Sequence, residues 1–112
     1  MLLVDGANVV GSRPDGWWRD RAGAADRLVR QLQALDGPVL VVLEGGARAG
    51  VAEGEHGGVV VRHAPGEGDD LLAELCGPGV VLVTADRELG ARGRRAGADV
   101  QGPRWLLEQL SG

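Results

Sequence analysis

Short apolar runs in this chain alternate with longer stretches in which apolar residues recur at helical spacing. The runs at 2–4, 39–43, 59–61 and 80–85 are rich in branched aliphatic residues and contain almost no polar interruptions. Such runs are typical of strands that are covered on both faces, as in parallel sheets. A shorter run at 98–100 predicts a fifth strand.

The segments between these runs have the spacing of amphipathic helices. Leu28, Leu32 and Leu35 lie at i, i+4 and i+7 and form one apolar stripe, which predicts a helix that starts at Trp17 or Trp18 and ends at Leu35. Further helices are predicted over residues 69–76, 87–96 and 103–110. Two polar, glycine-containing segments, 6–16 and 45–58, predict loops.

Strands and helices therefore follow one another in the order βαββαβαβα. This order predicts an α/β fold, a three-layer α/β/α sandwich with a mainly parallel central sheet and right-handed crossovers. The chain has 112 residues, of which 44% are hydrophobic. That length suffices for a single core, so we expect a single domain over residues 1–112.

Composition narrows the setting in which the protein works. Cys76 is the only cysteine, which excludes an internal disulfide and suits a reducing cytoplasm. No apolar run approaches the ~20 residues needed to cross a bilayer, and Met1 leads directly into a strand without a basic leader. We therefore expect a soluble, cytoplasmic protein with no membrane partner.

Charge gives a mixed indication about nucleic acid. The net charge of -4 argues against binding through bulk electrostatics alone. Every basic residue is an arginine, and these arginines concentrate in segments 13–21 and 87–95. Planar guanidinium groups suit phosphate oxygens, but solvated helix faces would give the same pattern, so both interpretations stay open.

Carboxylates mark the points where three of the apolar runs end. Asp5, Glu44 and Asp86 each follow a predicted strand directly. The carboxyl ends of parallel strands meet at one edge of a sheet, where ligands of open α/β folds bind. Like charges gathered there raise each other's pKa unless a cation lies among them. The pattern therefore predicts a divalent metal site.

A structural role is the alternative for each of these acids taken singly. Asp86 precedes a predicted helix that it could cap, and Asp69 and Asp70 open another. Asp5 could simply end its strand in a turn. The coincidence of several acids at one edge of the sheet favours a shared metal pocket.

Several motifs together carry a resemblance to a known family. They are LVDGANVV at 3–10, WWRD at 17–20, GEGDD at 66–70, and VTADREL at 83–89 followed by Gly97 and Ala98. In this order they resemble the NYN-domain proteins, a branch of the PIN-like nucleases, and above all the YacP-like ribonucleases. The resemblance extends over nearly the whole chain.

The resemblance implies a PIN-like fold and a ribonuclease, an endonuclease, that depends on Mg²⁺ or Mn²⁺. It assigns catalytic, metal-binding roles to Asp5, to an acid of the Asp69–Asp70 pair and to Asp86. Glu44 stands where many relatives have aspartate, and it can still reach a metal directly or through water. Asn8 and Thr84 fall where the family has polar groups near the metal or the phosphate. Asp99 falls near a position that supplies a further acid in some PIN-like proteins, and it ranks below the other acids.

The expected substrate is RNA, whose backbone a set of arginines would hold. The candidates that flank the predicted edge are Arg13, Arg19, Arg62 and Arg87. Trp17 and Trp18 are candidates for stacking an unpaired base, although at least one of them is expected in the core. A homo-oligomer or a larger RNA-containing assembly is compatible with these expectations.

Other functions fit the sequence less well. A phospho-accepting receiver domain relies on a lysine, and this chain has none. His56 and His63 are candidates for general bases, but both fall at positions typical of ordinary polar residues. The main competitor is a catalytically silent PIN-like domain that binds RNA or a protein partner and keeps its acids only as caps.

Overall fold

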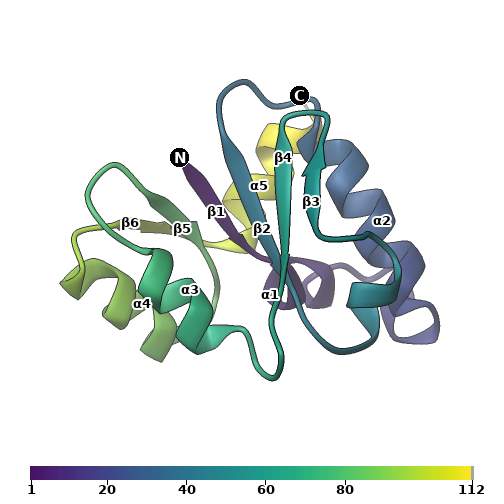
Figure 1. Cartoon of the computed structure of the whole chain (residues 1–112), viewed down its shortest axis with the longest axis horizontal. Helices are drawn as coiled ribbons and strands as arrows, with labels where there is room; N and C mark the ends of the chain where they lie inside the picture. Colours follow the sequence, from purple (N-terminus) through teal and green to yellow (C-terminus); the bar gives the residue numbers. More distant parts are fainter. Residues whose placement is uncertain (112) are drawn as a thin grey trace.

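A six-stranded sheet in the order β3-β4-β2-β1-β5-β6 forms the centre of the computed structural model, which describes residues 1–111 (Figure 1). Its strands are β1 (Leu2–Asp5), β2 (Val39–Leu43), β3 (Gly54–His56), β4 (Val59–His63), β5 (Val81–Val83) and β6 (Asp99–Gln101). Strands β4, β2, β1, β5 and β6 run parallel, and β3 pairs antiparallel with β4. The predicted mainly parallel α/β sheet is confirmed.

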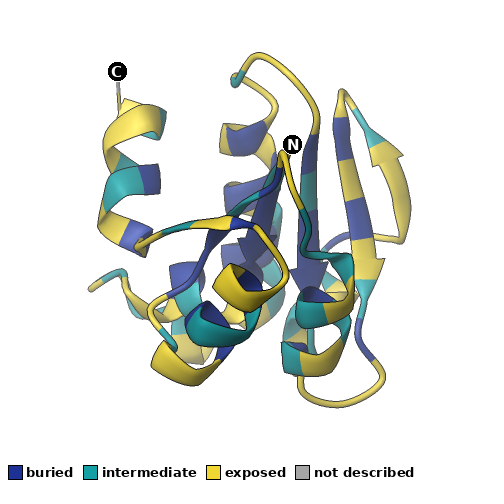
Figure 2. Ribbon diagram, turned by 90° about the vertical axis from the view of Figure 1, so that its left-hand side faces the viewer, coloured by how far each residue is buried: buried dark blue, intermediate teal, exposed yellow. Residues whose placement is uncertain are grey.

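Helices cover both faces of this sheet. They are α1 (Gly6–Gly11), α2 (Arg21–Leu32), α3 (Asp69–Leu75), α4 (Arg87–Arg95) and α5 (Pro103–Ser111), with the short 3-10 helices η1 (Trp17–Arg19) and η2 (Gly45–Ala49). Helices α1, α2 and α5 pack on one face, and α3 and α4 pack on the other (Figures 1 and 2). The predicted three-layer α/β/α arrangement is confirmed. Among residues 1–111, no helix is both long enough and apolar enough to cross a membrane.

The buried side chains divide into two groups, one on each side of the sheet. Val4 of β1 packs in the same cluster as Leu28 of α2 and Leu106 of α5. Its neighbour Leu3 points to the opposite face and joins the cluster that contains Leu72 of α3. This alternation along a strand is the geometric consequence of the two-residue β repeat. The central strands β1, β2 and β5 are accordingly almost entirely buried (Figure 2).

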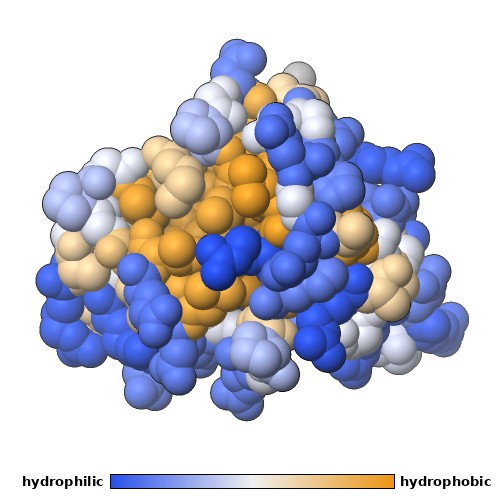
Figure 3. Space-filling model, in the orientation of Figure 1, coloured by the Kyte–Doolittle hydropathy of each residue, from blue (hydrophilic) through white to orange (hydrophobic). Residues whose placement is uncertain are grey.

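The face that carries α3 and α4 is covered less completely toward β4. Val60 of β4 is 38% exposed, and Leu40 of β2 is half-buried. Apolar surface is visible in this region in the space-filling view (Figure 3). The two helices therefore shield β1, β5 and β6 better than the hairpin side of the sheet.

The N-terminal connection differs from the prediction of a loop over residues 6–16. Residues Gly6–Gly11 form α1, because Asp5 caps the new helix and Val9 and Val10 are buried against the core. The predicted helix from Trp17 or Trp18 to Leu35 is also divided. It begins as η1, breaks at Asp20 and resumes as α2, which ends at Leu32.

The break has a local cause in the capping of α2. Asp20 has φ -151° and ψ 78°, outside the helical region, and its Oδ1 accepts a hydrogen bond from the N–H of Gly23 at 2.8 Å. A Cβ on Gly23 would lie only 2.2 Å from the Asp20 carboxylate. Asp20, which caps α2, therefore also interrupts the helical backbone between η1 and α2.

The segment predicted as the loop 45–58 also contains regular structure. It forms η2 and then β3, which pairs with β4 in a hairpin. The ring Nε2 of His56 and of His63 each lie 2.7 Å from a backbone carbonyl oxygen in this segment. Both histidines are thus bonded to the backbone of the hairpin region. The strand predicted over 80–85 is shorter, Val81–Val83.

Candidate functional site

At the centre of the sheet, the order in which the chain adds strands switches from one side of β1 to the other. Strand β1 lies between β2 and β5, and the chain builds β2, β3 and β4 on one side before it crosses to β5 and β6 on the other. A crevice at the carboxyl ends of the strands is the usual ligand site at such a switch point. These ends lie at the lower edge of the sheet in Figure 1. Asp5 is the last residue of β1 there, and Thr84 and Asp86 follow β5.

Asp5 is the most buried acid of this edge, with 6% of its surface exposed. The hydroxyl of Thr84 donates a hydrogen bond to its Oδ2 at 2.9 Å, and the N–H of Asn8 donates to its Oδ1 at 3.3 Å. Burial raises the pKa of Asp5, and the negative charges of Glu44 and Asp69 raise it further. The two hydrogen bonds oppose this shift but do not cancel it.

Asn8 and Thr84 connect the two strand-to-helix turns. The side-chain oxygen of Asn8 accepts a hydrogen bond from the N–H of Ala85 at 2.9 Å. The hydroxyl of Thr84, which donates to Asp5, accepts one from the N–H of Asp86 at 3.1 Å. Both side chains thus hold the β1–α1 turn against the β5–α4 turn. In the structure, these two predicted site residues therefore connect the two turns by hydrogen bonds.

Asp69 lies at the start of α3 and shares the edge with the other acids. Partial burial raises its pKa, and the charges of Asp86, Glu67 and Glu44 add to the shift in that order, while Arg92 lowers it. The carboxylate of Glu44 accepts a hydrogen bond from the N–H of Gly68. That bond connects the end of β2 to the start of α3.

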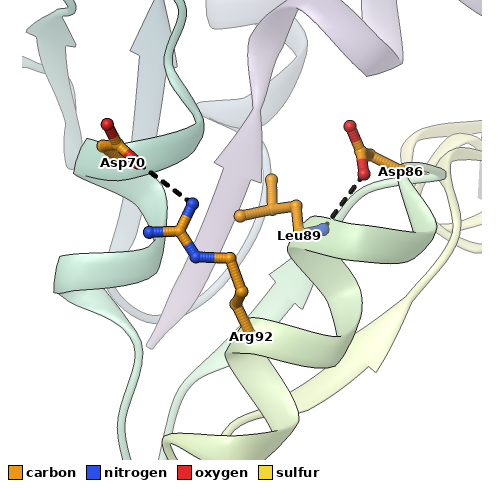
Figure 4. Close-up of polar contacts among 4 residues, drawn as sticks. All are labelled: Asp70, Asp86, Leu89 and Arg92. Carbon is orange, nitrogen blue, oxygen red and sulfur yellow. Dashed lines mark hydrogen bonds and ion pairs between the residues drawn. The ribbon is translucent and has the colours of Figure 1, made fainter.

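Asp70, the next residue, pairs with Arg92 of α4. Its Oδ1 lies 3.0 Å from Nη1 of Arg92, and 87% of its side chain is exposed. In Figure 4, Asp70 faces Arg92 across the gap between α3 and α4, while Asp86 caps α4 through the N–H of Leu89. Asp69 is therefore the member of the pair that faces the other acids.

We refer to the group formed by Asp5, Glu44, Glu67, Asp69 and Asp86 as the acidic cluster. Glu67 is a member that the sequence analysis did not select. Its position inside the GEGDD motif, two residues before Asp69, could have identified it from the sequence. Asp99 belongs to β6 at the sheet border and is exposed.

The four candidate arginines have different surroundings. Arg13 donates a hydrogen bond from Nη2 to Oε1 of Gln31 at 2.6 Å, so it faces α2. The guanidinium of Arg19 lies 5.8 Å from the ring centre of Trp18. Arg87 is exposed at the start of α4, directly after Asp86.

Arg62 of β4 is exposed and lines an open groove with Glu67 and Asp70, so it reaches the border of the acidic cluster. Arg21 was not among the candidates, although it lies nearer the cluster. It lines a pocket together with Trp17 and Glu44. Its spacing of four residues from Trp17, which places the two on one side of a helix, was a usable signal.

The donor set of the acidic cluster consists of carboxylate oxygens, the ligands that Mg²⁺ and Mn²⁺ prefer. Within residues 1–111, no group of three acidic, histidine or cysteine side chains is close enough to ligate one ion. Mg²⁺ commonly retains several waters and takes only one or two protein carboxylates. The cluster therefore suits an ion held partly through water, with Asp5 and Asp69 as the acids whose charge is least compensated.

The fold and this edge define a class of protein, a three-layer α/β/α sandwich with carboxylates at the carboxyl end of its central strands. No protein-family model and no curated protein sequence matches the chain. Solved structures do resemble it. A crystal structure of Rae1 (YacP) from Bacillus subtilis has a TM-score of 0.71 and 21% identity, covering 99% of this chain and 73% of that one.

A second crystal structure, of a tryptophan-to-leucine mutant of the same protein, has a TM-score of 0.72 and 20% identity over 98% of this chain and 74% of that one. At this level of identity the likeness shows the fold. The YacP-like fold implied by the sequence resemblance is therefore confirmed. The acidic cluster is defined by this chain's own residues and not by the comparison.

Proposed function

We propose that the chain is a cytoplasmic ribonuclease that cuts within RNA and depends on Mg²⁺ or Mn²⁺. The observation that carries the proposal is the acidic cluster, in which burial and mutual repulsion raise the pKa of both Asp5 and Asp69. Burial and repulsion disfavour the ionised carboxylates, and a bound cation would relieve both. The YacP-like fold and the matching motifs support the same activity.

The reaction is the hydrolysis of a phosphodiester bond. The oxygen of a water molecule forms a bond to phosphorus, the bond from phosphorus to the leaving ribose oxygen breaks, and that oxygen takes up a proton. A divalent ion held by the acidic cluster would lower the pKa of the attacking water and neutralise the charge on the phosphoryl oxygens.

The residues of the chain have distinct parts in this scheme. Asp5, Asp69 and Asp86 would hold the ion partly through bound water, since no three of the described acidic side chains are close enough to ligate one ion directly, and Glu44 would do so directly or through water. Thr84 and Asn8 keep Asp5 and the β5–α4 turn in fixed relative positions through their hydrogen bonds. Arg62 and Arg87 are the candidates for contacts with the RNA backbone, because both are exposed beside the cluster.

The adjacent acids of α3 provide a matched test. We expect Asp69→Asn to remove most RNA cleavage, because it takes a carboxylate from the cluster, whereas Asp70→Asn, which removes only an exposed pair with Arg92, retains most of it. Cleavage of a mixed RNA pool with Mn²⁺, or with EDTA in its place, followed by mapping of the new ends, measures both effects. Cleavage that continues in EDTA, or equal activity of the two variants, would contradict the proposal.

A catalytically silent domain that binds RNA or a protein partner is the second candidate. One observation favours it, namely that Asp5 and Asp86 both act as helix caps, a role that would retain them without any metal. The same RNA pool separates the two candidates. RNA that is bound but stays intact at every Mn²⁺ and Mg²⁺ concentration would identify the silent domain.

A further inference from the structure

A pocket of about 380 Å³ opens beside the acidic cluster. Its apolar lining includes Val10 of α1, Trp17 of η1 and Ala47 of η2, and its polar groups are Arg21, Glu44 and Glu67. Glu44 and Glu67 belong to the pocket and to the acidic cluster at the same time. A molecule seated in the pocket would therefore lie directly against the proposed site of hydrolysis.

The segments around this pocket are in close contact with their neighbours. A Cβ on Gly6, at the start of α1, would lie 2.6 Å from the carbonyl oxygen of Val42 in β2. A Cβ on Gly50, just after η2, would lie 2.0 Å from the carbonyl oxygen of Ala22 in α2. Both glycines allow backbone approaches that no other residue permits. The pocket is therefore built on closely packed elements and is largely preformed.

Trp17 and Arg21 offer planar surfaces to an occupant. The guanidinium carbon of Arg21 lies 5.4 Å from the ring centre of Trp17, and Trp17 meets Trp18 edge-on with ring centres 6.0 Å apart. Aromatic rings and guanidinium planes are the surfaces on which unpaired bases stack.

The polar groups restrict the chemistry of the occupant further. Glu44 and Glu67 carry negative charge, which disfavours a phosphate or a carboxylate inside the pocket. A purely aliphatic group would cover carboxylate surface without offering either side chain a hydrogen-bond donor. A nucleobase avoids both costs, because it is uncharged and flat and its edge carries N–H donors for carboxylates.

We propose that this pocket binds one unpaired nucleobase of the RNA strand whose phosphate lies at the acidic cluster. The inference rests on the proposed nuclease function and adds a selection rule to it. A base paired within a duplex is stacked between its neighbours and does not enter such a pocket. The pocket thus selects single-stranded RNA at the position of cleavage.

The adjacent pair of Trp18 and Arg19 is an internal control. It has the same composition and a similar spacing, 5.8 Å from guanidinium to ring centre. Trp18 is 56% exposed and is not part of the pocket lining. Trp18→Leu therefore removes, from the same segment, an aromatic ring that does not line the pocket, although it also removes the edge contact with Trp17.

The test is the affinity of a short, labelled single-stranded RNA, measured by fluorescence anisotropy in EDTA so that no cleavage occurs. We expect Trp17→Leu to weaken binding about tenfold, as loss of one stacked base implies, and Trp18→Leu to change it by less than about twofold. Trp17→Phe should restore most of the affinity, and the same RNA presented as a duplex should bind all variants equally.

A second measurement uses the unaltered protein. Replacing the bases of the RNA one at a time by abasic sites should weaken binding strongly at one position, and that position should lose its effect in Trp17→Leu. Equal losses for Trp17→Leu and Trp18→Leu, or no sensitive position with the unaltered protein, would overturn the pocket proposal. That result would not affect the proposal of metal-dependent cleavage. Binding that depends on one base, without any cleavage, would support the pocket proposal and contradict the nuclease proposal.

Discussion

The β1–α1 and β5–α4 turns are built to the same plan but give their aspartates different surroundings. In each turn the aspartate stands at the carboxyl end of the strand and caps the next helix, Asp5 by accepting from the N–H of Asn8 at 3.3 Å and Asp86 by accepting from the N–H of Leu89 at 3.0 Å. Asp5 is 6% exposed and has a raised pKa, whereas Asp86 is only half-buried.

The difference comes from the neighbours of the two turns. Asp5 is the last residue of β1 and pairs with Val42 of β2, and Gly6 lets α1 approach the backbone of β2. Asp86 lies beyond the end of β5 at Val83, outside the paired part of the sheet. An identical capping geometry thus yields one fixed, desolvated carboxylate and one solvent-accessible carboxylate. One aspartate can therefore both cap a helix and belong to a metal site. Burial determines which of the two carboxylates a bound cation would stabilise more.

The largest expected effect follows from neutralising the buried acid. Asp5→Asn should abolish RNA cleavage while the metal-free protein stays folded, because removing a desolvated charge and its neighbours' repulsion offsets the loss of one of the two hydrogen bonds that the carboxylate accepts. Asp86→Asn should reduce cleavage less, because asparagine preserves the cap of α4 and the charge it removes is less buried. Initial cleavage rates and metal-free melting curves measure these effects, and wild-type cleavage by Asp5→Asn would disprove its role as a ligand.

The second effect concerns the packing that buries Asp5. A methyl group on Gly6 would meet the carbonyl oxygen of Val42 at 2.6 Å, so Gly6→Ala should lower the free energy of unfolding by roughly 1–3 kcal/mol. Gly11→Ala is the control, since its added Cβ has only an ordinary contact of 3.9 Å with Trp17. Urea denaturation compares the two, and equal stabilities would show that the close approach at Gly6 is not what positions Asp5.

Removing the hydroxyl of Thr84, which lies between the two turns, should lower the free energy of unfolding by a similar or smaller amount. Thr84→Val takes the hydrogen bond from buried Asp5 and should cost about 1–2 kcal/mol of stability. It should also raise the pKa of Asp5 further, because that bond lowers the pKa. Thr84→Ser, which keeps the hydroxyl, should recover most of the loss, and failure to do so would assign the effect to packing.

The smallest effect is a dependence of stability on pH. The pKa of Asp5 is higher in the folded protein than in the unfolded chain, so the folded state binds more protons between these two values. Metal-free stability should therefore fall as pH rises from about 4 through the folded pKa. The slope should be smaller in Asp5→Asn, and denaturation over this pH range measures it. An identical slope in both proteins would place the titration elsewhere, with Asp69 as the next candidate.

The sequence predicted the parts of the fold that depend on continuous patterns. Apolar runs identified the parallel strands, and the acids that follow them identified one edge, because strand ends in a parallel sheet converge by geometry. It did not predict α1, since six residues with glycine at both ends have little helical signal. That helix forms because Val9 and Val10 are buried and Asp5 caps it.

The candidate site was predictable in its position but not in its side-chain directions. Asp69 and Asp70 are identical in type and adjacent, and only the packing of α3 against α4 decides which one meets Arg92. The same holds for Trp17 and Trp18, whose separation into a pocket wall and an exposed ring depends on the 3-10 turn. Such choices are tertiary and leave no trace in local spacing.

The central claim is that the acidic cluster binds a divalent cation through Asp5, and the most direct measurement is the melting temperature as Mn²⁺ is added. A ligand that binds only the folded state stabilises it by RT ln(1 + [L]/Kd). The melting temperature of the unaltered protein should therefore rise steadily through millimolar Mn²⁺, while that of Asp5→Asn should change little. No rise in the unaltered protein, or an equal rise in both proteins, would contradict the claim.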